Sequence, residues 1–362
     1  MPNDSTALPQ GSTIGILGGG QLGRMLSLAA SRLGMRTHIY CPDANSPAFE
    51  VTPHKTVAAY DDEVALSAFA DAVDVITYEF ENVPAATAAF LAARKPLRPG
   101  AHALAISQDR LAEKSFLASK NIPVAPHRAV ETLADLERAI DELGLPAVLK
   151  TTRLGYDGKG QRVLRHRADA AAAFAALEPK PLVLEAFVPF EKEISVVVAR
   201  NLSGEVRAFD AAENVHRDHI LFTSTVPAAI APGLEKHAAM LAKVIVVALD
   251  YVGVLGVEFF VVPGERATLM VNEIAPRVHN SGHWTEAVCL TDQFEQHIRA
   301  VLGWPLGDPA RMADVVMENL VGEEALSVPA GLDGDTQPHL YGKTEIRPGR
   351  KMGHVNRITR RV

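Results

Sequence analysis

The chain has 362 residues, a formal net charge of −7 and an apolar fraction of 48%. This apolar fraction excludes global disorder, and the acidic balance argues against nucleic acid as the main partner. At roughly 100–200 residues per domain, the length predicts two or three domains. The one concentrated basic stretch, 347–361, has a solvated tail as its simplest interpretation.

The sequence predicts neither secretion nor membrane insertion. Residues 1–6 lack the basic start and apolar core of a signal peptide. No apolar run approaches the ~20 residues that span a bilayer. Two cysteines, Cys41 and Cys289, suit a reducing compartment. We therefore expect a cytoplasmic protein with no membrane partner.

Strands and helices alternate over the first part of the chain. The predicted strands are 13–17, 37–41 and 71–78, and the predicted helices are 24–33 and 84–93. This alternation is typical of a parallel sheet with helical crossovers. We expect this first, Rossmann-like domain to cover residues 1–107.

A second series of elements follows the first domain. The predicted helices are 109–121, 132–143, 170–176 and 232–249, and the predicted strands are 147–150, 193–199, 256–262 and 269–273. The alanine-rich helix 170–176 is expected to be exposed. These elements predict a domain over residues 108–304, with a small module at about 118–185. Pro305–Pro309 reads as a linker to a short, turn-rich unit over residues 305–362.

A glycine-rich turn joins the first predicted strand to the first helix. Gly18, Gly20 and Gly23 form a G-x-G-x-x-G sequence, and Asp43 lies twenty residues beyond Gly23. This spacing is typical of nicotinamide-dinucleotide sites, in which a carboxylate holds the ribose hydroxyls. However, the same glycines let backbone N–H groups approach any phosphate, so a phosphorylated substrate fits equally well. Asp43 also lies in a good turn sequence, residues 42–45, and both interpretations stay open.

A second glycine-rich loop, residues 155–161, follows the strand that ends at Lys150. Its three glycines permit a turn that closes over phosphates, while Lys150 and Lys159 supply positive charge. The loop does not match the Walker pattern, so a P-loop fold is not expected. We predict phosphate binding, with a simple hairpin turn as the alternative.

Two carboxylates, Glu258 and Glu273, lie in neighbouring β-rich runs separated by the turn 263–266. In an antiparallel hairpin they would face each other at roughly 5 Å. Like charges at that separation are costly unless a cation lies between them, and Mg²⁺ typically takes one or two carboxylates plus nucleotide phosphates. The hypothesis is a magnesium site. A slipped register or one exposed carboxylate is the alternative.

A dense polar run, residues 275–285, follows the second carboxylate. Its hydrogen-bonding side chains are poor core material. Arg277 can bind an anion through its planar fork, and His279, Asn280 and Ser281 can contact a polar ligand. Nearer the C-terminus, turns that carry cations are predicted to bind a substrate phosphate or to supply surface charge.

Together these motifs resemble the ATP-grasp superfamily. The resemblance is carried by Lys150, 155–161, 183–188, Glu193, His216, Glu258 and Asn272-Glu273. Three further segments, 20–26, 272–285 and 347–351, resemble the N5-carboxyaminoimidazole ribonucleotide synthases of purine biosynthesis. The resemblance implies a protein of α/β and α+β class: an ATP-grasp fold with an N-terminal Rossmann-like parallel-sheet domain and a small C-terminal β-rich domain.

The resemblance also implies a reaction, the ATP-dependent carboxylation of 5-aminoimidazole ribonucleotide with bicarbonate. It would pass through carboxyphosphate and yield the N5-carboxylated nucleotide, ADP and phosphate. The implied cofactors are ATP and one or two Mg²⁺ ions, with neither biotin nor a nicotinamide. A homodimer is implied as well.

Residue roles follow from the same resemblance. ATP would be bound by Arg110, Lys150, Gly155, Tyr156, Asp157, Gly158, Lys159, Gly160, Gln161, Glu185, Ala186, Phe187, Val188, Glu193, His216, Asn272 and Glu273. The second substrate would contact Gly20, Gln21, Leu22, Glu79, Tyr156, Arg277, His279, Asn280 and Ser281, with Lys343 and Arg350 at its phosphate. Magnesium would be held by Glu258 and Glu273, and the catalytic residues would be Lys150, Asp157 and Arg277.

Three alternatives remain at this point. An oxidoreductase rests on residues 18–23 and Asp43 alone. A non-catalytic nucleotide-binding module would bind ATP without turnover. Another carboxylating or acylating ATP-grasp enzyme is the alternative closest to the hypothesis.

Overall fold

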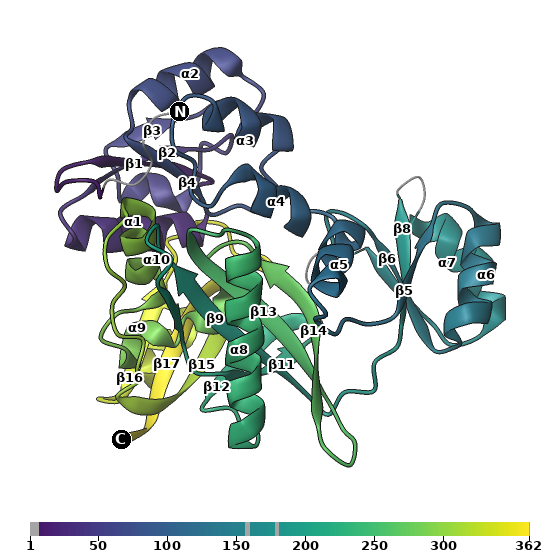
Figure 1. The fold of residues 1–362 in the computed structure, drawn as a ribbon. Helices are drawn as coiled ribbons and strands as arrows, with labels where there is room; N and C mark the ends of the chain where they lie inside the picture. Colours follow the sequence, from purple (N-terminus) through teal and green to yellow (C-terminus); the bar gives the residue numbers. More distant parts are fainter. Residues whose placement is uncertain (1–6, 156–159, 178–180, 362) are drawn as a thin grey trace.

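The computed structural model describes residues 7–155, 160–177 and 181–361, and these residues form three β-sheets (Figure 1). Four residues of the second glycine-rich loop, Tyr156, Asp157, Gly158 and Lys159, lie outside the described residues, so their predicted roles are not tested here. Within the described ranges no helix is long and apolar enough to cross a membrane.

The N-terminal sheet is parallel, as predicted, with strand order β3-β2-β1-β4. Its strands are β1 Thr13–Leu17, β2 Arg36–Tyr40, β3 His54–Thr56 and β4 Val75–Tyr78. The helices of this part are α1 Gln21–Arg32, α2 Glu63–Asp71, α3 Ala85–Ala92 and α4 Ala101–Ser107.

The predicted strand 71–78 is wrong over its first half. Helix α2 ends at Asp71, and the strand begins only at Val75. The side chain of Asp62 starts this helix by accepting hydrogen bonds from the backbone N–H groups of Val64 and Ala65. This N-cap was the signal in the sequence for a helix that the prediction missed.

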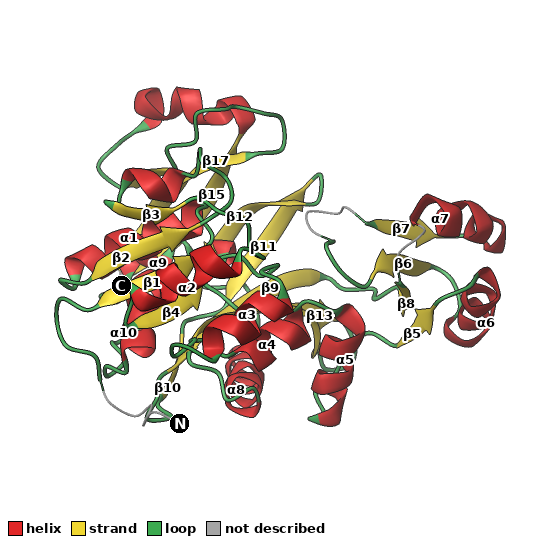
Figure 2. Cartoon of the chain, turned by 90° about the horizontal axis from the view of Figure 1, so that it is seen from above, coloured by secondary structure: helices red, strands yellow, loops and turns green. Residues whose placement is uncertain are grey.

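A small antiparallel sheet with strand order β5-β8-β6-β7 lies to one side, with α6 and α7 packed together over it (Figure 2). Its elements are β5 His127–Val130, α6 Leu133–Leu143, β6 Ala147–Thr151, β7 Gln161–Leu164, α7 Ala170–Leu177 and β8 Leu182–Ala186. The prediction of an exposed helix at 170–176 is wrong for one face. Ala173, Phe174 and Leu177 of α7 are buried because they recur at helical spacing towards the sheet.

A nine-stranded sheet forms the centre of the molecule, in the order β14-β13-β9-β11-β12-β15-β17-β16, with β10 paired to β9. Its strands are β9 Lys192–Arg200, β10 Val206–Ala208, β11 Ala212–Arg217, β12 Ile220–Val226, β13 Gly253–Val262, β14 Thr268–Ala275, β15 Ala313–Val321, β16 Thr336–Leu340 and β17 Lys351–Arg361. The associated helices are α5 Arg110–Ser119, α8 Pro232–Ala248, α9 Thr285–Val288 and α10 Gln293–Leu302. Short 3₁₀ turns cover 47–50, 167–169, 280–282 and 322–331.

Alternating side chains of the long strands pack against helices on both faces of this sheet. Ile194, Val196 and Val198 of β9 lie in one apolar core with α8, whereas Val197 and Ala199 lie in another core with α10 and α1. The second core therefore joins the N-terminal domain to the large sheet. The opposite burial of neighbouring residues follows from the two-residue period of a strand.

The interpretation of residues 347–361 as a solvated tail is wrong. Residues 351–361 form β17, which pairs with β15 on one side and β16 on the other. Met352, His354 and Val355 of this strand are buried, while Arg357 is exposed and lies beside Glu318. The basic residues concealed a strand pattern, because the sequence does not show that two other strands come to lie on either side.

Candidate active site

Three carboxylates meet on the large sheet near the small sheet. Glu258 of β13 and Glu273 of β14 are directly paired in an antiparallel register, as predicted from the turn between them. Burial, with added repulsion from Glu273, raises the pKa of Glu258 to about 8 and that of Glu193 on β9 to about 7. The Asn272 amide donates to Glu258 Oε2 at 3.4 Å. This acidic group therefore holds more negative charge than its buried surroundings stabilise.

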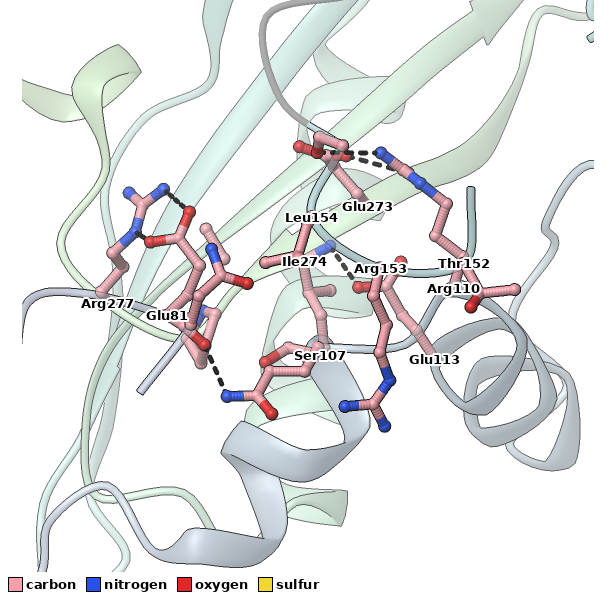
Figure 3. A pocket seen from close by; sticks show the side chains of 15 residues that line it. Glu81, Ser107, Arg110, Glu113, Thr152, Arg153, Leu154, Glu273, Ile274 and Arg277 are labelled. Atoms are coloured by element: carbon pink, nitrogen blue, oxygen red, sulfur yellow. Dashed lines mark hydrogen bonds and ion pairs between the residues drawn. The ribbon is translucent and has the colours of Figure 1, made fainter. Parts of the chain in front are cut away.

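Arg110 faces this carboxylate group from the start of α5. Its Nη1 lies 3.3 Å from Glu273 Oε2, and its Nη2 donates to the carbonyl of Gly155 at 3.4 Å (Figure 3). Asp109 caps the helix by accepting from the backbone N–H groups of Leu111 and Ala112, which fixes where Arg110 begins. The predicted ATP ligands Arg110, Gly155 and Glu273 are thus neighbours.

The Glu185 side chain links two lysines in the interior. Lys150 Nζ lies 2.8 Å from Glu185 Oε2, and Lys114 Nζ lies 3.3 Å from Glu185 Oε1. Burial opposes ionisation of this carboxyl, but the two ammonium groups outweigh it and lower its pKa to about 2. Burial lowers the pKa of Lys150. The sequence prediction missed Lys114, although it lies four residues after Arg110 and hence on the same face of α5.

Replacing Lys114 by Met is expected to destabilise the fold by about 3–5 kcal/mol, because it removes one partner from a buried ion pair. Urea unfolding measures the loss. Lys120→Met is the matched control at the C-cap of the same helix, since Lys120 is exposed and its loss is expected to cost less than about 1 kcal/mol. Equal stability of the two variants would contradict the assignment of Lys114 as a structural partner of Glu185.

The segment after Glu185 was predicted to contact the adenine through backbone groups. The N–H groups of Ala186 and Phe187 already donate to the carbonyls of Pro126 and Pro146. Any backbone contact of these two residues with the adenine must therefore use their carbonyl oxygens. His216 Nδ1 lies 3.3 Å from Glu193 Oε2, so the predicted pair Glu193 and His216 is brought together.

Arg277 is engaged by a residue that the sequence prediction missed. Its Nε and Nη2 form a bidentate pair with the Glu81 carboxylate at 2.6 and 2.8 Å (Figure 3). Although burial raises the pKa of Glu81, Arg277 outweighs this and holds it below its ordinary value. Glu81 follows β4 closely, and the carboxyl end of a parallel strand is where functional groups gather, so position was the available signal.

The polar run after Arg277 is ordered by mutual hydrogen bonds. His279 Nε2 lies 3.4 Å from Glu258 Oε1, and its Nδ1 lies 2.7 Å from Ser281 Oγ. The Asn280 and Asn319 amides exchange two hydrogen bonds. Burial lowers the pKa of His279 to about 3, so this imidazole is neutral.

Ser281 is placed behind His279 and is almost fully buried. Its hydroxyl also lies 2.7 Å from Ser195 Oγ. In this structure its hydroxyl orients His279, and its contact with the second substrate stays a prediction.

The first glycine-rich turn receives a carboxylate from the protein itself. Glu79 Oε1 accepts from the backbone N–H of Gly20 at 2.7 Å, at the start of α1. Gly18 has φ +104°, and a Cβ there would lie 2.5 Å from Glu79 Oε1. The space that a dinucleotide pyrophosphate would need is thus taken by Glu79. Asp43 accepts from the N–H of Asn45 at 2.9 Å, which is a turn contact.

Gln21 and Leu22 open helix α1 beside Glu79, and Leu22 is buried. Burial raises the pKa of Glu79 to about 7, and Arg277 and Lys343 oppose this rise. The predicted substrate residues Gly20, Glu79, Arg277 and Lys343 therefore converge.

The side chains of Lys343 and Arg350 both donate hydrogen bonds to backbone carbonyl groups. Lys343 Nζ donates to the carbonyl of Lys351 at 2.6 Å, and burial lowers its pKa to about 8. Arg350 donates to the carbonyl of Glu345 at 2.7 Å. Both cations lie in the segment between β16 and β17, as predicted for a turn.

A pocket joins two parts of this site. It extends from Glu81 and Arg277 to Arg110 and Glu273, and the loop at Gly155 lines one side (Figure 3). Buried Glu113 lines it as well and accepts from the Ile274 N–H at 3.1 Å. The pocket lies between the N-terminal domain, α5, the loop after β6 and the end of β14.

A small sheet that carries Lys150, beside a large sheet that carries the paired carboxylates Glu258 and Glu273, defines an ATP-grasp enzyme. Family models agree along the chain: "ATP-grasp domain" matches residues 115–294, "Ribonucleotide synthetase preATP-grasp domain" matches 11–108, and "Phosphoribosylaminoimidazole carboxylase C-terminal domain" matches 315–362.

Curated relatives and solved structures show which family of ATP-grasp enzymes this chain resembles. The chain is 55% identical to N5-carboxyaminoimidazole ribonucleotide synthase of Brucella melitensis, over 99% of both chains, and 44% identical to that of Bacillus subtilis, over 95% of this chain and 91% of the relative. An ADP complex of the synthetase from Staphylococcus aureus superposes with a TM-score of 0.93 at 37% identity, covering 98% of this chain and 95% of the other.

A complex of the Aspergillus clavatus synthase with ADP and 5-aminoimidazole ribonucleotide superposes with a TM-score of 0.90 at 31% identity, covering 97% of this chain and 94% of the other. The chain belongs to the N5-carboxyaminoimidazole ribonucleotide synthase family. It is an ATP-dependent enzyme of the ligase type. The reaction of the family is the ATP-dependent carboxylation of 5-aminoimidazole ribonucleotide in purine biosynthesis.

Proposed function

We propose that this chain carboxylates 5-aminoimidazole ribonucleotide with bicarbonate, using Mg²⁺-ATP, and that the pocket between Arg277 and Glu273 is where the reaction occurs. The observation that carries this proposal is that one pocket brings Arg277 together with Arg110 and with Glu273 of the paired carboxylates. Lys150, held by Glu185, is proposed to act on the phosphates from outside this lining. The domain division at 107/108 and 304/305 belongs to the same proposal.

The carboxylates fit magnesium. Glu258 and Glu273 are paired, with Glu258 mostly buried and Glu273 partly exposed, and Glu193 lies near them. Burial and repulsion from Glu273 raise the pKa values of Glu258 and Glu193, which indicates negative charge without a full counter-charge. Oxygen ligands of this kind are what Mg²⁺ prefers. When bound, the ion would supply charge neutralisation for the ATP phosphates. Glu258 and Glu273 would hold it, with Asn272 orienting Glu258.

The remaining residues supply binding and orientation. Bicarbonate is a poor electrophile, so the terminal phosphoryl group of ATP must activate it as carboxyphosphate, which releases ADP. Arg110 and Lys150 stabilise the charge that develops on the phosphoryl group. Arg277 stabilises the negative charge on the carboxylate of bicarbonate and carboxyphosphate. Breakdown of carboxyphosphate releases phosphate and CO₂ next to the exocyclic amine of the ribonucleotide. The amine then forms the C–N bond and loses one proton.

The second substrate is proposed to lie between the start of α1 and the segment before β17. Gln21 is next to the Gly20–Glu79 contact, and Lys343 lies close enough to Glu79 to lower its pKa. Lys343 and Arg350 would bind the ribonucleotide phosphate, while Glu79 accepts from polar groups of the base or sugar. Asp157 stays a predicted acceptor for the proton of the amine.

Oligomeric state and compartment are also proposals. We expect a homodimer, which sedimentation equilibrium can test. Met240, Val244 and Val247 are exposed at helical spacing on α8 and offer an apolar surface for it. The cytoplasm is the proposed compartment, since Cys41 and Cys289 are both free thiols.

The experiment that tests the function measures ADP release with Mg²⁺-ATP, bicarbonate and 5-aminoimidazole ribonucleotide, omitting each in turn. We expect ADP formation to require the ribonucleotide, and the carboxylated product to rise with bicarbonate. ADP release that is indifferent to the ribonucleotide would favour another ATP-grasp ligase. ATP binding without turnover would favour a non-catalytic module.

A thermal-shift comparison separates the ligase from an oxidoreductase. Mg²⁺-ATP at about 100 times its Kd is expected to stabilise the fold by about 2.7 kcal/mol, whereas NADH is expected to leave the melting temperature unchanged. The physical reason is that Glu79 fills the start of α1 and repels a pyrophosphate there. A rise with NADH that Glu79→Gln enhances would contradict the proposal.

A further inference from the structure

A second group of histidine and carboxylate side chains lies apart from the proposed active site, where α9 meets the C-terminal strands. Glu286 projects from α9, His339 from β16 and His354 from β17. His354 is fully buried, while the side chains of Glu286 and His339 are 15% and 23% exposed. The group is thus buried at His354 and reaches solvent at Glu286 and His339.

The ligand atoms of this group have the spacing of a metal site. Glu286 Oε1 lies 3.6 Å from His339 Nδ1, Glu286 Oε2 lies 3.5 Å from His354 Nε2, and one ligand atom from each residue lies within 4.8 Å of the others. At metal–ligand distances of about 2.0–2.1 Å, two ligand atoms of a tetrahedral zinc site lie about 3.3–3.4 Å apart. The two carboxylate–imidazole separations, each to a different oxygen of Glu286, are slightly longer than this value. The side chains would therefore move inward to hold one ion.

Buried polar atoms in the group lack hydrogen-bond partners. His354 Nε2 and Glu286 Oε2 lie at ion-pair distance, 3.5 Å, but neither atom has a hydrogen-bond partner among the described residues, and the same holds for His339 Nε2. Leaving such atoms unsatisfied is costly, so each calls for a ligand. A dication would remove this cost.

One ring is already oriented for metal binding. Tyr341 Oη lies 2.9 Å from His354 Nδ1, which leaves Nε2 directed towards Glu286. Metal-ligating histidines almost always use their second ring nitrogen in this way. His339 stacks parallel to His354 with centroids 4.6 Å apart, so its ring must turn to bring Nδ1 onto an ion. Its place on the edge strand β16 leaves room for that turn.

The geometry points to a transition-metal site of the zinc type, formed by Glu286, His339 and His354, that is separate from the ATP-associated carboxylates. Two imidazoles and one carboxylate suit Zn²⁺ and disfavour Mg²⁺, which takes oxygen ligands. Three protein ligands leave a fourth position for water at the open edge. The ion would tie α9 to β16 and β17 and so fasten the C-terminal strands to the rest of the molecule.

Zn²⁺ titration by calorimetry tests this site in metal-free, tag-free protein. The titration is run in excess Mg²⁺, which keeps the carboxylates of the active site from competing. We expect one Zn²⁺ per chain, a rise in melting temperature, and visible absorption typical of four-coordinate Co²⁺ when Co²⁺ replaces Zn²⁺. Glu286→Gln keeps the side-chain volume, and His339→Ala changes a partly exposed position on an edge strand, so both variants are expected to fold.

Both variants are expected to weaken Zn²⁺ binding about 100-fold or more. The exposed His102→Ala is the matched control and is expected to bind as the original chain does. No saturable binding by the original chain would overturn the site. Unchanged affinity in both Glu286→Gln and His339→Ala would overturn it as well, because the bound ion would then lie elsewhere.

Discussion

Glu273→Gln is expected to lower ATP-dependent turnover about a thousand-fold while the fold persists. The substitution keeps the side-chain volume but removes the charge that faces both Glu258 and Arg110. The free amide is a poor ligand for a hard dication, so the ATP phosphates lose their counter-charge in the transition state. ADP release at saturating Mg²⁺-ATP measures the effect. Glu265→Gln, in the exposed turn of the same hairpin, is the control and is expected to keep full activity.

Glu273→Gln is also expected to change how the free energy of unfolding depends on pH. Glu258 has a pKa of about 8 in the folded state against an ordinary value of 4.5, so between these values the folded state binds more protons than the unfolded state. Without Mg²⁺, the contribution of Glu258 to the free energy of unfolding therefore falls as the pH rises from 4.5 to 8. Glu273→Gln is expected to flatten this fall, because it removes repulsion at Glu258. Urea unfolding across this range measures it, and an unchanged slope would contradict the carboxylate coupling.

Arg277→Met is expected to lower the free energy of unfolding by about 3–5 kcal/mol. It is also expected to lower the rate of ADP release about 100-fold or more. It leaves the Glu81 carboxylate buried without its bidentate partner. The double variant Glu81→Gln, Arg277→Met removes both charges and is expected to regain most of the stability. Its ADP release is nevertheless expected to stay low, because the arginine that stabilises the anion is still missing.

This pair of variants separates two roles of Arg277. Recovery of both stability and activity in the double variant would show that Arg277 acts only as a partner of Glu81. Arg128→Met with Glu142→Gln is the matched control, since this ion pair is exposed and its loss is expected to cost less than about 1 kcal/mol. Urea unfolding and ADP release are measured on the original chain, the single variant Arg277→Met and the two double variants.

Local patterns were enough to predict several parts of this molecule. The pairing of Glu258 with Glu273 follows from a short turn between two strands, because a hairpin turn fixes the register of its own strands. The parallel N-terminal sheet follows in the same way from alternating strands and helices. Helix α6 was predicted to within one residue, because its Thr132 cap and apolar spacing are both local signals.

Other parts depended on contacts between distant segments. Glu81 lies 196 residues from Arg277, and Lys114 lies 71 residues from Glu185, so no local spacing links either pair. Strand β17 was taken for a tail because its basic residues hid its buried face, which exists only once β15 and β16 lie beside it. The first glycine-rich turn matched a dinucleotide site until Glu79 was seen to fill it.

The residue types and short-range spacings of this chain therefore determine its local elements, its hairpin of carboxylates and its resemblance to one family. The partners of its buried charges follow from the tertiary structure instead. A buried charge is stabilised by whichever opposite charge the fold brings within hydrogen-bonding distance, and chain separation does not restrict that choice. Backbone geometry, in contrast, is set mostly by neighbours within a few residues, which is why it can be read along the sequence.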